Sequence, residues 1–257
     1  MPRSVPPELR AFDFSGQKAV VTGAGRGIGL AIALRLRDLG ATVIAIDKDA
    51  AALQTAFPDK ECEPLLADVA ADDPLALGDL LVREHGPIPL VVNNVGITTP
   101  HAFLDLEPAE FDLVFRTNLR GPWFLTRQLA SALISAETGG SILFVSSVHD
   151  TYIRLNPHYS ASKAAVAMLV KELAYELAPH RIRVNAVSPG WIKTEEHVDP
   201  ERERTLKAQI PAGRHGEPDD VARVALVLLS DELSPYVSGA NVTVDGGLSL
   251  VNWLTER

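Results

Sequence analysis

Cysteine is nearly absent from this sequence, since Cys62 is the only one among 257 residues. A lone cysteine cannot form an internal disulfide, which excludes the disulfide framework of small secreted proteins and favours a reducing cytoplasm. The N-terminal stretch also lacks the charged and then apolar pattern of a secretory signal. Long apolar runs are missing as well, because none approaches the roughly 20 residues needed to cross a bilayer. We therefore expect a cytoplasmic protein with no membrane partner.

Basic residues are in deficit, with 24 Lys and Arg against 33 Asp and Glu, and the formal net charge is −9. This charge argues against a nucleic-acid partner. The seven histidines and the single cysteine form no ligand-like cluster, so no metal is expected. Hydrophobic residues make up 46% of the chain and charged residues 22%, which is a globular balance. We expect a loose, proline-containing arm at residues 1–12 and a single domain over residues 13–257.

Short β-branched runs alternate with longer segments of helical periodicity from residue 18 onward. This pattern is typical of parallel strands joined by crossover helices, and it shows no internal repeat or linker. The predicted strands are 19–22, 42–46, 64–67, 90–93, 141–146, 183–187 and 241–244, and the predicted helices are 28–39, 74–85, 111–135, 159–178 and 219–229. The sequence therefore predicts an α/β fold, a doubly wound parallel sheet of about seven strands with helices on both faces.

A glycine-rich turn, TGAGRGIG at residues 22–29, follows the first predicted strand and leads directly into a helix. Glycines let the backbone turn sharply and approach a diphosphate, whose charge suits the N–H groups at a helix N-terminus. Taken alone, such a turn could also be a flexible connection between a strand and a helix. Its position in a strand–turn–helix unit favours a dinucleotide site.

Asp47 ends the second predicted strand, at the distance from Gly23 expected of an acid that binds the ribose hydroxyls of NAD. An acid there repels the 2′-phosphate of NADP, so NAD is the expected cofactor and NADP the less favoured one. Arg26 and Lys48 argue in the other direction, toward NADP, because either could pair with a phosphate. A solvated turn residue is the alternative interpretation of Asp47.

Four further segments follow in order along the chain: Asp68-Val69, Asn93-Asn94-Val95-Gly96, the YSASK segment at residues 159–163, and PGWIKT at residues 189–194. Together with the glycine turn, whose spacing is TGxxxGxG, they resemble the motifs of the short-chain dehydrogenase/reductases. The resemblance extends from about residue 13 to residue 247. It implies a Rossmann-type fold and an NAD(P)-dependent enzyme that acts on CH–OH groups.

The resemblance also implies where each part of the cofactor binds. Asp68 meets the adenine amino group, the NNVG segment steadies the sheet beside the cofactor, and the PGxxxT loop holds the nicotinamide half. Valine at position 95 replaces the usual alanine, so packing near the adenosine differs slightly. The expected cofactor-binding residues are Gly23, Arg26, Gly27, Ile28, Gly29, Asp47, Asp68, Val69, Asn94, Gly96, Tyr159, Lys163, Pro189, Gly190, Ile192 and Thr194.

Tyr159 and Lys163 form the family's YxxxK pair. Residues four apart share a helix face, so the ammonium of Lys163 can lie near the phenol of Tyr159. A tyrosine with a pKa of about 10 is a poor base at neutral pH, but a nearby cation favours the phenolate. In isolation, YxxxK would more often be a core tyrosine and a surface lysine.

The family also requires a serine at the end of the fifth strand, where its hydroxyl binds the substrate oxygen. Two adjacent serines compete for this role. The usual interval of about 13 residues before Tyr159 selects Ser146, whereas alignment of the strand ILFVSSV selects Ser147. We choose Ser147, because a loop can lose one residue but a shift within a strand turns the hydroxyl to the other face.

Asn118 completes the implied catalytic set. It lies in a predicted helix, where asparagine is intrinsically disfavoured, and in this family it accompanies a local irregularity that holds a water linked to the lysine. The implied oxidation has Tyr159 removing the hydroxyl proton while hydride goes to the nicotinamide, with Lys163 lowering the pKa of the tyrosine. Ser147 would orient the substrate oxygen, and Asn118 would complete a proton relay.

Substrate identity rests on the weakest signals. The stretch SSVHD at residues 146–150 resembles the SSVHE of some bacterial sugar 1-dehydrogenases, so a small sugar or polyol is expected, with Ser147, His149 and Tyr159 as substrate residues. Residues 191–214 should form a helical or mobile lid. The alternatives to a sugar or polyol dehydrogenase are an NADPH-dependent 3-oxoacyl or ketone reductase and a nucleotide-binding sensor without turnover. The resemblance also implies a homotetramer, because the two long predicted helices, 111–135 and 159–178, commonly pair across subunits in this family.

Overall fold

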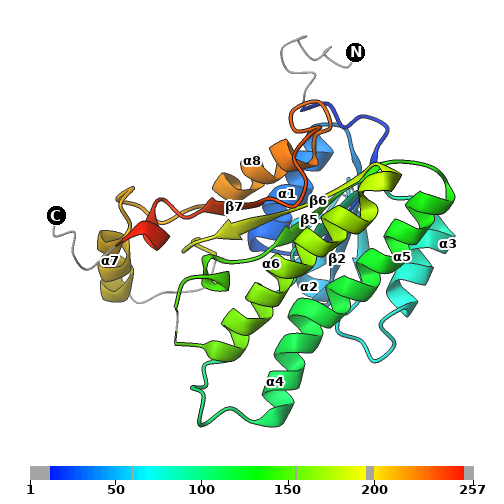
Figure 1. Cartoon of the computed structure of the whole chain (residues 1–257). Coiled ribbons are helices and arrows are strands. Elements are labelled where there is room, and N and C mark those ends of the chain that lie inside the picture. Colours follow the sequence, from blue (N-terminus) through cyan, green and yellow to red (C-terminus); the bar gives the residue numbers. More distant parts are fainter. Residues whose placement is uncertain (1–11, 60, 154, 195–199, 252–257) are drawn as a thin grey trace.

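The computed structural model describes residues 12–59, 61–153, 155–194 and 200–251, and the predicted arm lies outside them except for Phe12 (Figure 1). A seven-stranded sheet forms the centre, in the order β3-β2-β1-β4-β5-β6-β7, and neighbouring strands pair in parallel. The strands are β1 Lys18–Thr22, β2 Thr42–Asp47, β3 Glu63–Leu66, β4 Leu90–Asn93, β5 Gly140–Val145, β6 Ile182–Pro189 and β7 Asn241–Val244. This confirms the predicted doubly wound sheet.

Helices cover both faces of the sheet (Figure 1). One face packs against α1 (Gly27–Asp38), α2 (Ala50–Ala56) and α8 (Pro218–Leu229), and the other against α3 (Ala76–His85), α5 (Gly121–Ser135) and α6 (Pro157–Leu177). Successive strand residues point to opposite faces, so Val21 joins the core under α1 while Val20 joins the core under α5. Burial on both faces explains why the central strands are almost uniformly apolar.

Two predicted helical features need correction. The prediction had no helix at α2, because a seven-residue segment is too short for helical periodicity to be recognised. The start of α2 is fixed by the Asp49 side chain, which accepts hydrogen bonds from the N–H groups of Ala51 and Ala52. The predicted helix at 111–135 begins earlier, as α4 (Pro108–Phe115), and a π-helical turn, η2 (Arg116–Arg120), separates it from α5. A further helix, α7 (Pro200–Gln209), lies in the predicted lid.

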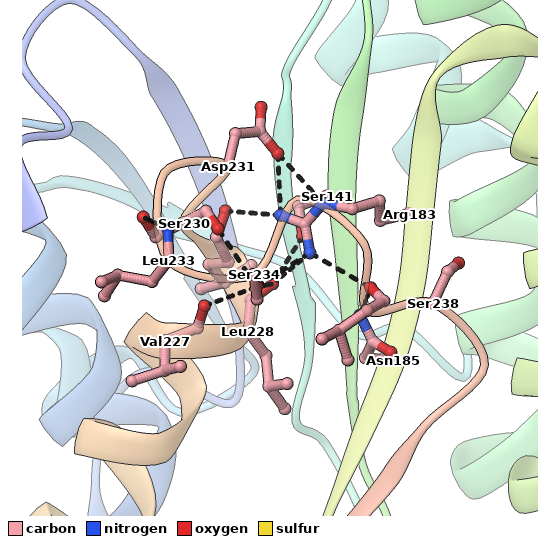
Figure 2. Close-up of polar contacts among 12 residues, drawn as sticks. Ser141, Arg183, Asn185, Val227, Leu228, Ser230, Asp231, Leu233, Ser234 and Ser238 are labelled. Carbon is pink, nitrogen blue, oxygen red and sulfur yellow. Dashed lines mark hydrogen bonds and ion pairs between the residues drawn. The ribbon is translucent and has the colours of Figure 1, made fainter. Parts of the chain in front are cut away.

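Arg183, on β6, ties the loop after α8 to the sheet, as Figure 2 shows. Its guanidinium donates to the carbonyl oxygens of Leu228 and Leu229, at 2.7 and 3.2 Å, and to the carboxylate of Asp231 at 2.8 Å. The Ser234 hydroxyl accepts a further hydrogen bond from it, at 3.2 Å. Arg183 is 8% exposed. A buried guanidinium is therefore satisfied by carbonyls that the end of a helix leaves without intrahelical partners.

The direction in which successive strands extend the sheet reverses between β1 and β4. β2 and β3 extend the sheet on one side of β1, and β4 to β7 extend it on the other. In sheets of this kind the loops at the carboxyl ends of the strands diverge at such a reversal and leave a crevice. The site is therefore expected at the ends of β1 and β4.

Candidate active site

A pocket of about 890 Å³ lies at this edge of the sheet. The loops after six strands contribute to its wall, so residues far apart in the sequence meet there. Its lining consists of Gly23, Arg26, Gly27, Ile28, Ile46, Asp47, Lys48, Ala67, Asp68, Val69, Asn94, Val95, Gly96, Ile97, Thr117, Val145, Ser146, Ser147, Tyr159, Lys163, Pro189, Gly190, Trp191, Ile192, Lys193 and Thr194. Most of the predicted site residues are thus brought together. Gly29, Asn118 and His149 do not line the pocket.

The glycine turn forms one wall. Gly23 and Gly27 have φ values of +66° and +57°, which favour glycine over other residues. Gly29 lies behind the turn, where a Cβ atom would meet the carbonyl oxygen of Gly23 at 2.1 Å. The first turn of α1 contains no acidic residue. Its N–H groups therefore present positive potential to the pocket, which suits a diphosphate.

Asp47 is buried at the end of β2. One carboxylate oxygen accepts a hydrogen bond from the N–H of Gly25 at 2.9 Å, and the other accepts from the N–H of Asp49 at 3.0 Å. Each carboxylate oxygen has a second lone pair, so the group can still accept from ribose hydroxyls. Arg26, at the same wall, pairs with Asp49 at 3.0 Å, and Lys48 also lines the pocket.

The ends of β1 and β4 are joined by side-chain hydrogen bonds. The Asn94 amide donates to the carbonyl oxygens of Thr22 and Gly23, at 3.0 and 3.1 Å. The Thr22 hydroxyl accepts from the N–H of Asn94 at 3.0 Å. On the far side of the sheet, Asn93 donates to Thr126 on α5 at 2.8 Å. These bonds hold the glycine turn against β4, as the predicted steadying role of the NNVG segment requires.

Tyr159 and Lys163 lie one turn apart on α6, with the amine of Lys163 5.8 Å from the centre of the Tyr159 ring. Lys163 is 3% exposed, and its amine donates to the carbonyl oxygen of Val145 at 2.9 Å. Burial lowers the pKa of the Lys163 amine to about 8, and the charge of Asp150 opposes this shift. A Cβ on Gly96 would meet the amine at 3.0 Å, so a side chain at this position would press on the Lys163 amine.

The two serines at the end of β5 have different partners. The Ser146 hydroxyl donates to the carbonyl oxygen of Lys163 at 3.3 Å and lies 3.4 Å from the Asp150 carboxylate. The Ser147 hydroxyl instead accepts from the N–H of His149 at 3.2 Å, which leaves its proton to be donated elsewhere. Both serines line the pocket. The proton of the Ser147 hydroxyl can therefore be donated to an oxygen atom in the pocket.

Asn118 is buried in the π-helical turn η2. Its amide nitrogen donates to the carbonyl oxygen of Ile97 and to the Ser162 hydroxyl, both at 2.9 Å, and its oxygen accepts from the N–H of Ile97 at 2.8 Å. The Ser162 hydroxyl in turn donates to the carbonyl oxygen of Tyr159 at 2.7 Å. Asn118 therefore links the loop after β4 to the first turns of α6, and the expected local irregularity is the π turn.

His149 lies beside Tyr159, with ring centres 6.3 Å apart, although it does not line the pocket. Its Nδ1 is 3.0 Å from the carbonyl oxygen of Tyr152. A carbonyl only accepts, so Nδ1 carries a proton, and Nε2 of the neutral ring is an acceptor. The His149 ring is therefore oriented next to the phenol of Tyr159.

Near α7 lie several residues to which the sequence motifs gave no role. Lys193 is 3.3 Å from the Glu203 carboxylate of α7, and the same carboxylate is 3.3 Å from Nε2 of His215. The Trp191 ring packs edge-on against His215, with centres 5.6 Å apart. These contacts connect α7 to the loop after β6. No sequence signal marked them, because the partners are ordinary charged residues on separate elements.

Within the described part of the chain, no group of three or more His, Cys, Asp or Glu residues is placed to hold a metal ion. No helix among those residues is long and apolar enough to cross a membrane. The site therefore consists of a phosphate-compatible turn, a ribose-compatible carboxylate and a phenol beside a buried amine. Such a set can bind a dinucleotide and exchange a proton with a bound hydroxyl.

Comparison with known proteins is consistent with this geometry. A family model described as enoyl-(acyl carrier protein) reductase matches residues 23–249. The chain is 38% identical to the 3-oxoacyl-(acyl-carrier-protein) reductase FabG of Thermotoga maritima over 244 residues, covering 91% of this chain and 98% of the relative. It is 36% identical to the D-erythrulose reductase of Gallus gallus over 244 residues, covering 92% and 97%.

Solved structures are similar over nearly the whole chain. A short-chain type dehydrogenase/reductase from Mycobacterium marinum is 35% identical, with a TM-score of 0.87, and the match covers 95% of this chain and 99% of that one. A gluconate 5-dehydrogenase from Burkholderia cenocepacia, in complex with NADP and tartrate, is 31% identical, with a TM-score of 0.86 and coverage of 95% and 100%.

Proposed function

Because the chain belongs to the short-chain dehydrogenase/reductase family of NAD(P)-dependent enzymes acting on CH–OH groups, we propose that it oxidises a small sugar or polyol with NAD. The reacting group in this proposal is a secondary or anomeric hydroxyl. One observation carries the proposal: Tyr159 and Lys163 share a pocket with the glycine turn and with Asp47. A nucleotide held by the turn would extend toward the phenol.

The residues present fit a nicotinamide dinucleotide. The glycine cradle has no room for a Cβ at Gly29, and the N-terminus of α1 faces the pocket without an acidic residue. Asp47 supports NAD over NADP, because its charge would repel a 2′-phosphate. The ion pair between Arg26 and Asp49 also supports NAD, since it occupies one of the two cations, Arg26 and Lys48, that could bind that phosphate. Related enzymes bind NADP, so cofactor choice is part of the proposal.

The proposed mechanism assigns one task to each residue. NAD supplies the hydride acceptor when it is bound. Tyr159 takes the proton of the substrate hydroxyl, and the Lys163 ammonium favours the phenolate that does so. Ser147 donates a hydrogen bond to the substrate oxygen and holds it against Tyr159. Asn118 fixes the loop after β4 against α6, so that Lys163 keeps its position beneath the pocket.

A polar substrate is supported by His149, a partly buried residue whose imidazole packs beside Tyr159 and is able to form hydrogen bonds. The relationship to a D-erythrulose reductase supports the same choice. The relationship to a 3-oxoacyl reductase supports the rival, an NADPH-dependent reduction of acyl thioesters.

Substrate panels separate these possibilities. Initial rates with NAD should be measured for aldoses, polyols and hydroxysteroids, and rates with NADPH for a 3-oxoacyl thioester and simple ketones. We expect the largest kcat/KM for an aldose or polyol with NAD. A tenfold or greater preference for hydroxysteroids or acyl thioesters would reject the sugar assignment and leave the family assignment intact.

The predicted homotetramer remains a proposal. Exposed apolar side chains on α5 and α6, including Trp123, Met168 and Tyr175, support association through these two helices. Light scattering on the purified protein measures the assembly directly, and a monomer at micromolar concentration would contradict the proposal.

A further inference from the structure

A carboxylate beneath the pocket is held by the ends of three strands. Asp150 is the last residue of the short helix η3 (Val148–Asp150), which follows β5. Its carboxylate accepts hydrogen bonds from the Ser188 hydroxyl at 3.0 Å and from the Asn241 amide at 2.5 Å. The Ser146 hydroxyl lies 3.4 Å from the same oxygen. Asp150 therefore faces the ends of β6 and β7, and it is not part of the pocket lining.

The charge of Asp150 is not compensated by a neighbouring cation within ion-pair distance, as far as the described residues show, and the three donors around it are neutral. Ser146 connects this carboxylate to the catalytic helix, because its hydroxyl also donates to the carbonyl oxygen of Lys163, at 3.3 Å. The amine of Lys163 donates to the carbonyl oxygen of Val145, the residue before Ser146, so the half-buried carboxylate and the fully buried amine contact adjacent residues at the end of β5. At low local dielectric, such a charge acts on the amine more strongly than it would in water.

We propose that Asp150 is a positioning residue that keeps Lys163 in its ammonium form and fixes the end of β5, where Ser146 and Ser147 lie. This inference rests on the proposed role of Lys163. Burial alone favours the neutral amine, and the negative charge of Asp150 raises the pKa of Lys163 against that effect. The ammonium is the form that favours the Tyr159 phenolate, so Asp150 acts on the reaction through Lys163.

The surroundings of Lys163 offer few other charges. On its own helix it faces the Tyr159 ring, and from β5 it meets the carbonyl oxygen of Val145. The loop after β4 contributes Gly96, which is neutral. Among the described residues, Asp150 is the one carboxylate that acts on the protonation of the amine. Its removal should therefore be visible in the titration of Lys163.

The test replaces Asp150 by asparagine, which keeps the size and one acceptor oxygen and removes the charge. In protein with ¹³C-labelled lysine and no cofactor, the Lys163 Cε resonance can be assigned by its absence from Lys163→Met. Without the carboxylate the amine loses its proton more easily, so we expect the midpoint of this titration to move to lower pH by half a unit or more. The alkaline limb of the kcat/KM profile should move in the same direction.

Two variants act as controls. Ser188→Ala removes one hydrogen bond to the Asp150 carboxylate but leaves its charge, so the midpoint should stay at the wild-type value. Asp150→Glu keeps the charge and should restore most of the wild-type titration. Asp150→Ser repeats the neutral substitution with a smaller side chain, should the asparagine variant fail to fold.

The proposal is overturned if the Lys163 midpoint in Asp150→Asn or Asp150→Ser coincides with that of the wild type. It is also overturned if Ser188→Ala shifts the midpoint as far as these variants do. Loss of activity by the same factor at every pH, with an unchanged titration, would show that Asp150 is purely structural. The titration needs no substrate. Failure of the proposed sugar oxidation would therefore be detected separately, in the substrate panel.

Discussion

At the scale of single residues, Tyr159 carries the proposed chemistry, and its hydroxyl is the part that can be removed alone. Tyr159→Phe keeps the ring beside Lys163, so we expect kcat to fall by about 10²–10⁴, the usual contribution of a general acid or base. NADH affinity, measured by fluorescence titration, should change little. Tyr152→Phe, on the neighbouring loop, is the matched control and should retain turnover. Near wild-type turnover in Tyr159→Phe would remove this residue from the proposed mechanism.

The adjacent serines provide a second test, because their hydroxyls have different partners. Ser147→Ala should lower kcat by about 10²–10³, as expected when a donor to a developing oxyanion is lost. Ser146→Ala should have a smaller effect, since its hydroxyl bonds to the Lys163 carbonyl and not to substrate. Steady-state kinetics measure kcat for both variants and show which serine contributes more to turnover. The reverse order of the two effects would favour the sequence interval over the strand alignment.

Asp47 governs the proposed cofactor choice. Asp47→Asn keeps an acceptor for the N–H of Gly25 and removes the charge that repels a 2′-phosphate. We expect the ratio of kcat/KM for NAD over NADP to fall by about tenfold, which corresponds to the 1.4 kcal/mol of a modest charged interaction. Asp47→Ala should reduce NAD use further, because the ribose acceptor is lost as well. An unchanged ratio in both variants would exclude Asp47 from the ribose site.

At the scale of elements, Arg183 joins β6 to the loop that leaves α8 (Figure 2). Arg183→Ala removes a donor from the carbonyl oxygens of both Leu228 and Leu229, of which Leu228 keeps the hydroxyls of Ser141 and Ser234, so the free energy of unfolding should fall by about 3 kcal/mol. Asp231→Asn should cost less than about 1 kcal/mol, because the Asp231 side chain is 78% exposed and solvent screens the pair. Urea unfolding followed by circular dichroism measures both values. Equal losses would mean that the ion pair, and not the carbonyl contacts, holds the loop.

The sequence predicted elements where a pattern was long or strongly apolar. The predicted boundaries of β4 and β7 agree with the structure, because their apolar runs begin and end abruptly. α2 was missed because seven residues show no clear period. The π turn at Asn118 could be expected only through the family resemblance, since a π turn and an α-helix share the same composition.

At the scale of the whole molecule, the predicted sheet explains why most proposed site residues share one pocket. Most of them lie at or just after the end of a strand, and the carboxyl ends of parallel strands meet at one edge, while Tyr159 and Lys163 reach that edge from α6. The contacts around Asp150 and Arg183 could not be predicted in this way. Asp150 meets Ser188 and Asn241, which lie 38 and 91 residues away in the chain, and no local pattern specifies such pairings.

The order of the strands also has a consequence for synthesis of the chain. Because β1 pairs with β2 and then with β4, the glycine turn and Asp47 are surrounded by completed neighbours once β4 has been made. Each of β5, β6 and β7 then adds to the strand made immediately before it. Folding of chains during translation proceeds from the N-terminus. The strands around the proposed nucleotide site can therefore pair on the ribosome before Ser147, Tyr159 and Lys163 have been synthesised, whereas α8, which packs on the same face of the sheet as α1, is added after all of these.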